Sequence, residues 1–438
     1  MLEPLYTADE MRAAEEGHAI EAMMERAGRA VADEVVRLYP DARRIAAVCG
    51  KGSNGGDGRI AVRLLRDAGL DAEETDDPSG ADVVIDALFG TGFRGEPRPD
   101  AAALIERING AGAPVLAVDI PSGVDASTGE VAGSAVRAEH TVTMHAWKVG
   151  LVVAPGRFHA GAVSVAGIGI PQRETEHHLV TRDVLGLVPR RREGDNKYTA
   201  GSVLVVGGAR GLTGAACLAV EAAFRADAGY VAVAAPEESL PVLETRLLEA
   251  VKRPLDQVDE AAQRAGALAL GPGLGEGRED LVRRLLDEQD LPAVVDADGL
   301  RSLQPLERTA PTVLTPHEGE LGRLLGEDSS WVKAHRLAAV RRAAEHFRCV
   351  VLLKGADTLV AAPNTGVLVV SLGPPSLATA GTGDVLTGII GAFLAKGLEA
   401  SLAAAAGTAA QQLAAGLVEH QAGLVAHDVV DAVPRALG

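Results

Sequence analysis

The sequence predicts an α/β protein with two domains, each a three-layer α/β/α arrangement in which helices cover both faces of a parallel sheet. Short apolar runs rich in β-branched residues alternate with longer helical patterns along most of the chain, as is typical of βαβ units. The chain has 438 residues, a length that favours two or three domains over one. Polar and charged residues interrupt the alternation between Pro171 and Asn196. We therefore expect a domain junction there and place the domains at 1–178 and 179–438.

The first domain is expected to begin with a helix and then to alternate strands with glycine-bearing loops. Thr7 and Glu10 have the spacing of a capping box, and the helical pattern behind them extends to about Leu38. Segment 45–49 is predicted as a buried strand, 50–58 as a glycine-rich loop and 57–68 as the helix that follows. Further strands are predicted at 83–86 and 115–119, and each ends in an aspartate before another loop.

The second domain repeats the alternation with longer, alanine-rich helices. Strands are predicted at 202–206, 230–234, 267–270, 293–295, 312–314 and 350–353. Glycine-rich turns follow several of them, at 207–215, 271–275 and 354–358. Each of these turns alone is best explained by close packing of a helix on a strand. A tight turn at 381–384 is expected to open a helix over 384–396.

Composition excludes several classes of function. The net charge is −18 at pH 7, which disfavours nucleic acids and anionic membranes as partners. The sequence has no long uncharged apolar span and no basic, signal-like start, so we expect a cytoplasmic protein. Cys49, Cys217 and Cys349 lack CxxC spacing, and we expect buried thiols rather than disulfides or zinc ligands.

Three loops of the first domain follow three predicted strands. In open parallel sheets, ligands bind outside the carboxyl ends of the strands, so these loops are expected to share one crevice. Asn54, Asp86 and Ser122 offer oxygen ligands for a cation. The glycines of segment 90–95 leave room for a phosphate-bearing ligand, with which Arg94 can pair. One such loop alone would be explained as a capped turn, whereas three at separate strand ends favour a site.

In the second domain, Asp384 lies where the glycine turn opens a helix. Amides of the turn can surround a developing negative charge, and a carboxylate there is expected to stay ionised and to accept a proton from a substrate hydroxyl. Simple helix capping explains this aspartate equally well. His317 has two readings of the same kind, because Thr315 and Glu318 have capping-box spacing with Pro316 at the first helical position. It is either a first-turn residue or a hydrogen-bond partner for a ligand.

Taken together, these segments resemble the bifunctional NAD(P)H-hydrate repair enzymes. Segments 53–58, 86–95 and 119–122 are similar to the YjeF N-terminal domain, the NAD(P)H-hydrate epimerase, which implies a Rossmann-like fold. Segments 271–275, 315–320, 354–358 and 381–384, in that order, are similar to the ribokinase-like NAD(P)H-hydrate dehydratase. The resemblance covers nearly the whole chain. Segment 381–384 alone would indicate only a ribokinase-like protein.

The resemblance implies two activities on one damaged cofactor. An isomerase interconverts the R and S forms of hydrated NADH and NADPH, and a lyase returns the S form to NAD(P)H at the expense of ADP, or of ATP as in eukaryotic dehydratases. Asp119 is implied as the acid–base group of the epimerase. Asp384 is implied as the base that deprotonates the substrate hydroxyl for phosphoryl transfer, after which phosphate leaves. A potassium ion, magnesium and a homo-oligomeric state are also expected.

The resemblance also assigns ligand contacts residue by residue. The epimerase contacts to the hydrate are Ser53, Asn54, Gly55, Gly56, Asp57, Gly90, Thr91, Gly92, Phe93, Arg94, Gly95, Glu96 and Asp119. The potassium ligands are Asn54, Asp86 and Ser122. The dehydratase contacts to the hydrate are Ala215, Gly273, His317 and Asp384. The nucleotide contacts are Lys354, Gly355, Ala356, Asp357, Thr358 and Gly383.

One departure from the family pattern concerns the epimerase. The usual loop has two consecutive asparagines, and the first of them is Ser53 in this chain. Serine still donates and accepts hydrogen bonds, so we expect weakened or rearranged substrate contacts. The competing hypothesis is a ribokinase-superfamily kinase for a small vitamin precursor, with a non-catalytic N-terminal binding module. The kinase accounts for segment 381–384 but not for the first domain. Asn54, Asp86, Asp119 and Ser122 together argue against a non-catalytic module there.

Overall fold

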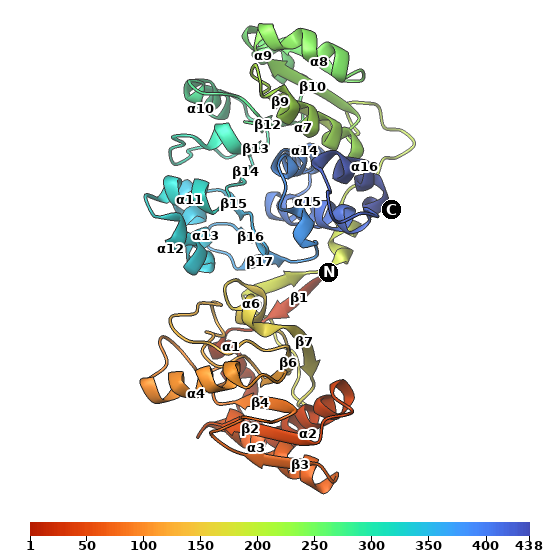
Figure 1. Ribbon diagram of the computed structural model, residues 1–438. Helices are drawn as coiled ribbons and strands as arrows, with labels where there is room; N and C mark the ends of the chain where they lie inside the picture. The colour runs from red at the N-terminus through yellow and green to blue at the C-terminus, as the bar shows by residue number, and fades with distance from the viewer. The chain divides into compact units, whose positions relative to one another are not determined.

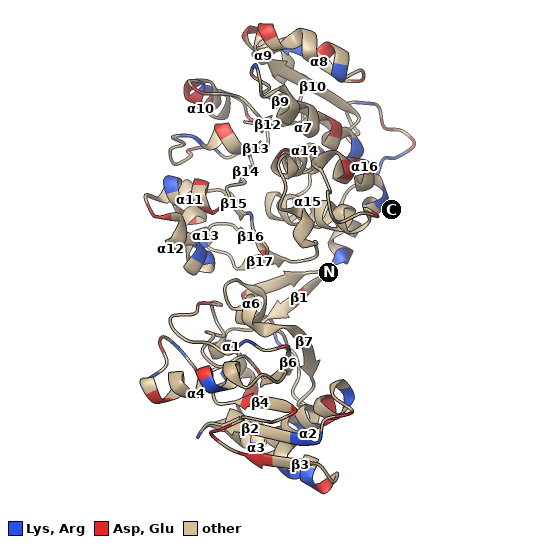
Figure 2. Ribbon diagram, viewed as in Figure 1, with Lys and Arg blue, Asp and Glu red and all other residues tan.

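The computed structural model describes residues 1–438, which divide into two compact units (Figure 1). The N-terminal unit comprises Pro4–His178 and the short segment Lys333–Leu337. The C-terminal unit comprises Met1–Glu3, Leu179–Val332 and Ala338–Gly438. Each contains a largely parallel sheet with helices, which confirms the predicted α/β class. In Figure 2, Lys and Arg are interspersed with Asp and Glu on the outer helices. None of the helices combines the length and the apolar character needed to span a bilayer.

The N-terminal unit is built on a six-stranded sheet of order β3-β2-β4-β5-β6-β7, in which every pair is parallel. Successive side chains of a strand point to opposite faces of the sheet. Apolar residues on both faces of this sheet pack against helices. Ile45, Ile85 and the apolar stripes of α2 and α3 form one core cluster, whereas Val48, Val84 and α4 form another. The strands are β2 (Arg44–Cys49), β3 (Asp71–Glu74), β4 (Val83–Ala87), β5 (Val115–Val118), β6 (His140–Met144) and β7 (Ala162–Ala166). The helices are α1 (Ala8–Glu15), α2 (Ile20–Leu38), α3 (Ser53–Asp67), α4 (Pro99–Gly110), α5 (Val149–Val152) and α6 (Arg157–Ala160).

The C-terminal unit is built on a sheet of order β17-β16-β15-β14-β13-β12-β9-β10-β11, beyond whose β17 edge come β8 (His177–Val180) and β1 (Leu2–Leu5). Only β15–β16 and β16–β17 are antiparallel among the pairs of these nine strands. The strands are β9 (Ser202–Val206), β10 (Tyr230–Ala235), β11 (Val251–Pro254), β12 (Ala267–Leu270), β13 (Ala293–Val295), β14 (Thr312–Leu314), β15 (Val350–Leu353), β16 (Thr358–Ala361) and β17 (Val367–Val370).

Two groups of helices flank this sheet, which lies between them in Figure 1. On one side, small side chains let the helices approach closely, and most alanines of α15 are completely buried in the main core cluster. That group is α7 (Thr213–Arg225), α14 (Thr382–Ala395), α15 (Ala400–Gly416) and α16 (Ala426–Leu437). The other group is α10 (Glu279–Glu288), α11 (Glu318–Leu325), α12 (Ser329–Ala334) and α13 (Arg336–Phe347), and the short helices α8 (Leu240–Arg246) and α9 (Val258–Ala262) lie near β10 and β11.

The structure corrects two of the expected elements in the N-terminal unit. The helical pattern up to Leu38 is two helices, because the chain breaks between α1 and α2 at Gly17, whose φ is 82°. Segment 53–58 is not a loop but the first turns of α3. Gly55 allows this early start, since a Cβ there would lie 1.9 Å from the carbonyl oxygen of Gly50. The predicted glycine-rich loop is therefore confined to 50–52.

Candidate active sites

The predicted cation ligands of the N-terminal unit lie together at the carboxyl ends of β4 and β5. The backbone N–H and the hydroxyl of Ser122 donate to the Asp86 carboxylate at 2.8 and 2.6 Å. The Phe89 N–H donates to Ser122 Oγ at 2.8 Å, and Asn54 Nδ2 donates to the Phe89 carbonyl at 2.8 Å. One hydrogen-bonded network therefore links Asn54, Asp86 and Ser122 through the loop after β4.

This network has the donor chemistry of a cation site. Asp86 is completely buried and forms no ion pair. Burial raises the pKa of Asp86 to about 6, although hydrogen bonds from Ser122 and Leu88 oppose the rise. The oxygens of Asn54, Asp86, Ser122 and the Phe89 carbonyl are ligands that hard cations prefer. A cation held among them would neutralise the buried carboxylate, so the residues present fit the expected ion.

Asp119 follows β5 in a left-handed backbone conformation, with φ of 67°. Three donors contact its Oδ1 atom: Lys148 Nζ at 2.6 Å, the Met144 N–H at 3.1 Å and Thr143 Oγ1 at 3.3 Å. Uncommon backbone angles outside glycine are held in place by such surroundings and concentrate at functional sites. Lys148 was missed by the sequence analysis. The available signal was a single charge within the apolar segment 146–154.

Asp57 lies on α3 and is 8% exposed. Its Oδ1 atom is buried and receives no hydrogen bond. Burial, together with the charges of Asp119 and Glu15, raises the pKa of Asp57 to about 8. Burial and Asp119 also raise the pKa of Glu15, which ends α1 and was not among the predicted residues. Three carboxyl groups therefore lie within range of one another's charge.

Only part of the predicted dinucleotide-binding loop after β4 lies close to the cation-site residues. A Cβ on Gly90 would meet Asn54 at 3.1 Å, so the loop approaches the first turn of α3 closely. Phe93 stacks on Phe89 with ring centroids 4.9 Å apart. Arg94, expected to face a phosphate, instead forms an exposed ion pair with Asp9 at 3.0 Å. A phosphate would have to compete with that carboxylate for the guanidinium group.

The C-terminal unit has a second strand-end network, centred on Asp296. This aspartate follows β13 and is 1% exposed. Lys354 Nζ donates to its Oδ1 at 2.7 Å and Thr387 Oγ1 donates to its Oδ2 at 2.9 Å. Burial alone would raise the pKa of Asp296, but Lys354 and the hydrogen bonds of Lys354, Thr387 and Thr315 hold it below its usual value. The sequence analysis did not single out Asp296, although it directly follows a correctly predicted strand.

Asp384 lies beside this network in the first turn of α14, whose N-cap Gly381 has φ of 89°. A Cβ on Gly383 would lie 3.4 Å from both Asp296 Oδ2 and Lys354 Nζ, so the turn packs directly onto the ion pair. The expectation that Asp384 stays fully ionised is not met. Burial and the charges of Asp296 and Asp298 outweigh Lys354 and raise the pKa of Asp384 to about 7.

His317 connects to the same network through α11, but the predicted capping box is wrong. The N-cap is His317 rather than Thr315: its Nδ1 accepts the Gly319 N–H at 2.9 Å, and Glu320 accepts the His317 N–H at 2.8 Å. Glu320 also lies 3.9 Å from Lys354 Nζ. Thr315 directly follows β14, and its N–H donates to the Val295 carbonyl at 3.0 Å.

The remaining predicted residues lie on turns at the same end of the sheet. A Cβ on Gly273 would meet the Leu212 carbonyl at 2.5 Å and the Ala215 side chain at 3.1 Å, so these two turns touch. Gly271 touches the Asp296 carbonyl in the same way. The turn after Lys354 places Gly355 and Ala356 at the surface, whereas Asp357 and Thr358 are buried. The turns at Gly271 and Gly273 therefore pack closely against neighbouring backbone at this end of the sheet.

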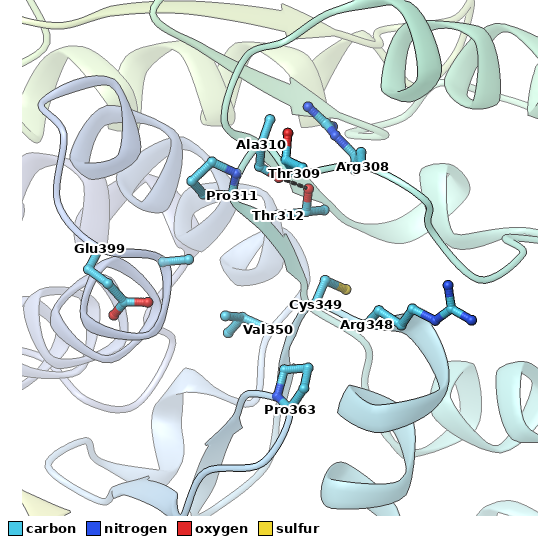
Figure 3. Close-up of a pocket in the computed structure, with 11 residues that line it drawn as sticks. Arg308, Thr309, Ala310, Pro311, Thr312, Arg348, Cys349, Val350, Pro363 and Glu399 are labelled. Atoms are coloured by element: carbon cyan, nitrogen blue, oxygen red, sulfur yellow. Dashed lines mark hydrogen bonds between the residues drawn. The ribbon is translucent and has the colours of Figure 1, made fainter.

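A cavity of about 270 Å³ lies elsewhere, at the amino ends of β14 and β15 (Figure 3). It is lined by Arg308, Thr312, Arg348, Cys349 and Glu399, among others. None of the predicted site residues lines it. The Arg308 and Arg348 side chains extend in different directions in Figure 3 and do not converge on a common point. The strand-end networks, not this cavity, are the candidate active sites.

Two different family models match the two halves of the chain. The family model described as NAD(P)H-hydrate dehydratase matches residues 203–435, and the model of the YjeF-related protein N-terminus matches residues 20–74 and 69–150. The bifunctional NAD(P)H-hydrate repair enzyme Nnr of Moorella thermoacetica is 36% identical over 95% of this chain and 92% of its own length. The Escherichia coli enzyme of the same name is 33% identical over 98% of this chain and 93% of its own length.

A solved structure supports the fold of the C-terminal unit. The ADP/ATP-dependent NAD(P)H-hydrate dehydratase of Bacillus subtilis, co-crystallised with ATP and Mg²⁺, superposes with a TM-score of 0.54 at 30% identity. The match covers 58% of this chain and 96% of that one. Since the relatives span both halves of the chain at this level of identity, the chain belongs to the family of bifunctional NAD(P)H-hydrate repair enzymes.

Proposed function

We propose that this chain repairs hydrated NADH and NADPH in two steps on two separate sites. The N-terminal unit, within 1–178, interconverts the R and S hydrates, and the C-terminal unit, within 179–438, dehydrates the S hydrate at the expense of ADP. The observation that carries this assignment is the similarity, over nearly the whole chain, to enzymes named for the repair of NAD(P)H hydrate. Each unit supplies a lysine-paired aspartate at the end of a strand and a second aspartate, with a raised pKa, at the start of a nearby helix.

In the dehydratase, Asp384 accepts the proton of the substrate hydroxyl while the hydroxyl oxygen bonds to the terminal phosphorus of ADP and AMP leaves. Phosphate then departs with the electrons of the C–O bond, and loss of the neighbouring C–H proton restores the ring double bond. Ala215, Gly273 and His317 contact the hydrate. The turn Lys354, Gly355, Ala356, Asp357 and Thr358, with Gly383, holds the nucleotide. Magnesium reaches this site with the nucleotide phosphates, whose charge it neutralises.

In the epimerase, the hydrate lies between the start of α3 and the loop after β4, with Asp119 as an acid–base group. Its contacts are those of residues 53–57 and 90–96, with Ser53 in place of the usual asparagine. Asn54, Asp86 and Ser122 would hold a potassium ion, whose charge would stabilise the buried Asp86 carboxylate. We place the protein in the cytoplasm and expect a homo-oligomer, which size-exclusion chromatography with light scattering tests.

One assay tests both steps. A mixture of R and S hydrates is supplied with ADP or ATP, magnesium and potassium, and the near-ultraviolet absorbance of reduced nicotinamide is followed. Complete recovery is expected. No recovery with either nucleotide would reject the dehydratase and would favour a kinase of another substrate. Recovery of the S fraction alone would reject the epimerase and would favour a non-catalytic N-terminal module.

A further inference from the structure

The epimerase site contains three carboxyl groups but a single buried cation. Asp57, Asp119 and Glu15 lie within range of one another's charge. Lys148 is completely buried, and its ammonium group donates to Asp119 Oδ1 at 2.6 Å, to Thr143 Oγ1 at 2.9 Å and to the Met144 carbonyl. An ammonium group has three donors, so all of them are used within the protein. Asp57 and Asp119 are both buried, and close carboxylates in a buried site oppose one another's ionisation, so the hydrogen bonds that each receives distinguish the two.

Asp119 and Asp57 differ in the number of hydrogen bonds that they receive. Lys148, Thr143 and the Met144 backbone each donate one hydrogen bond to Asp119 Oδ1, and hydrogen bonds to a carboxylate favour its charged form. Asp57 has the opposite surroundings, because its buried Oδ1 receives no hydrogen bond. We propose that Asp119 is the ionised base of the epimerase, that Asp57 is its neutral acid, and that Lys148 is the positioning residue that decides which of them carries the charge. This proposal rests on the epimerase function proposed above.

None of the other ionisable groups nearby provides a positive charge that would stabilise an ionised Asp57. Burial, together with Asp119 and Glu15, raises the pKa of Asp57 to about 8, so it is mostly protonated at neutral pH. Burial also raises the pKa of Glu15, with Lys148 and Arg12 opposing. His145 is a poor cation here, because burial and Lys148 lower its pKa. Asp57 therefore keeps a proton to donate while its neighbour remains a carboxylate.

This pair performs epimerisation with balanced proton transfers. Asp57 gives its proton to the hydroxyl oxygen of the hydrate, the C–O bond breaks, and the ring nitrogen lone pair forms a C=N⁺ bond as water leaves. A second water attacks the other face of that carbon and gives a proton to Asp119, while the C=N⁺ electrons return to nitrogen. Water is neither gained nor lost overall. One proton has moved from Asp57 to Asp119, and exchange with bulk water restores the starting state.

The test measures epimer exchange by full-length protein in the absence of nucleotide, starting from the pure S hydrate and separating the epimers by chromatography. The wild-type rate should fall about tenfold per pH unit above pH 8, because Asp57 must be protonated to act. Asp57→Asn should lower the rate by roughly 10²–10⁴-fold, the usual contribution of a general acid. Asp67→Asn, on an exposed carboxyl of the same helix, is the matched control and should keep the wild-type rate.

Thermal unfolding of the N-terminal unit checks the folding of each variant, and dehydration of the S hydrate by the C-terminal unit should be unchanged. Lys148→Met should lower kcat with KM preserved, a division that a purely structural lysine would not produce. In ¹⁸O-labelled water, the newly formed epimer should carry the label.

Three results would overturn the proposal: wild-type exchange by Asp57→Asn, an unlabelled product, or a pH profile that stays flat above pH 8. If wild-type protein shows no exchange at all, the epimerase function fails and this proposal fails with it. Exchange by wild type together with an unaffected Asp57→Asn variant rejects this proposal alone. The two failures are thus distinguishable.

Discussion

The beginnings of α3 and α14 present the same local chemistry in two units. Each helix follows a glycine turn and carries an aspartate in its first turns, the buried Asp57 in one and the half-buried Asp384 in the other. Each aspartate lies near a strand-end aspartate that is held by lysine: Asp119 by Lys148 at 2.6 Å, and Asp296 by Lys354 at 2.7 Å. The sequence motif is similar, and so is the composition of the surroundings.

The two sites differ in whether the lysine also affects the pKa of the aspartate on the helix. Lys354 remains 22% exposed and is close enough to Asp384 to oppose the effect of burial, and the pKa of Asp384 rises only to about 7. No cation opposes the rise at Asp57, whose pKa reaches about 8. A carboxyl group that ionises near neutral pH is suited to act as a base, whereas one that keeps its proton is suited to act as an acid. Similar glycine–aspartate helix starts can therefore have opposite roles.

The largest expected effect separates the two units by removing the base of the second. Asp384→Asn keeps the shape of the side chain but cannot accept a proton, so nucleotide-dependent recovery of NADH from the S hydrate should fall by roughly 10²–10⁴-fold. Epimer exchange, measured by chromatography without nucleotide, should be unchanged. A parallel loss of exchange would contradict the assignment of two independent sites.

Asp119→Asn should produce the reverse pattern. Epimer exchange should fall by roughly 10²-fold or more, while dehydration of the pure S hydrate persists. The variant also leaves Lys148 buried without its counter-charge, and breaking a buried pair costs about 3 kcal/mol or more. Calorimetry should show that the N-terminal unit unfolds at a lower temperature. Unchanged stability would mean that Lys148 is not held by this carboxylate.

Sequence patterns predicted the central strands of both sheets but not β3, β6, β7 or β11. Five of the six strands predicted in the second domain have the predicted bounds, because apolar runs such as Val203–Val206 are buried on both faces of a parallel sheet. The edge hairpin β16–β17 was not predicted. Helix boundaries were less accurate, since the start of α3 depends on a contact between Gly55 and Gly50 that no local propensity records.

The charge state of the sites could not be predicted from sequence. Lys148 and Asp119 are 29 residues apart, and Lys354 and Asp296 are 58 apart, so their pairing exists only in the folded chain. The helix-terminus argument favoured an ionised Asp384, whereas burial and Asp296 dominate. Arg94 looked like a phosphate ligand by spacing, but Asp9 comes from α1 to pair with it. Ion pairs between residues far apart in the sequence thus determine the charge states and partners of site residues, which local motifs do not specify.

Lys354→Met sharpens the comparison by removing the cation that distinguishes Asp384 from Asp57. Asp296 would remain buried and unpaired, which should cost about 3 kcal/mol in the stability of the C-terminal unit. Without Lys354 the pKa of Asp384 should rise further, so the ascending limb of the dehydration profile should move to higher pH. Thermal unfolding and a pH–rate profile measure the two effects. Thr387→Val, which removes only one hydrogen bond to Asp296, should cost about 1 kcal/mol and leave the profile in place.

The two activities of wild-type protein should respond to pH with opposite slopes. In the proposed mechanism dehydration requires ionised Asp384, so its rate should rise about tenfold per pH unit below pH 7 and level off above it. Epimer exchange should fall above pH 8 for the reason given for Asp57. Initial rates of both steps between pH 5.5 and about 9.5 decide the matter. Parallel profiles would mean that the two carboxyl groups play the same role.

The smallest expected effect concerns the cation network of Asn54, Asp86 and Ser122, which has no counterpart among the carboxyl pairs compared above. An ion that binds only the folded state stabilises it by about 2.7 kcal/mol at a concentration 100 times its Kd. Replacing potassium by lithium should therefore lower the unfolding temperature of the N-terminal unit by a few degrees and slow epimer exchange several-fold, while dehydration of the S hydrate persists. In Asp86→Asn the stabilisation by potassium should disappear. If it persists in that variant, the ion is held elsewhere, and the buried Asp86 carboxylate depends on its hydrogen bonds from Ser122 and Leu88.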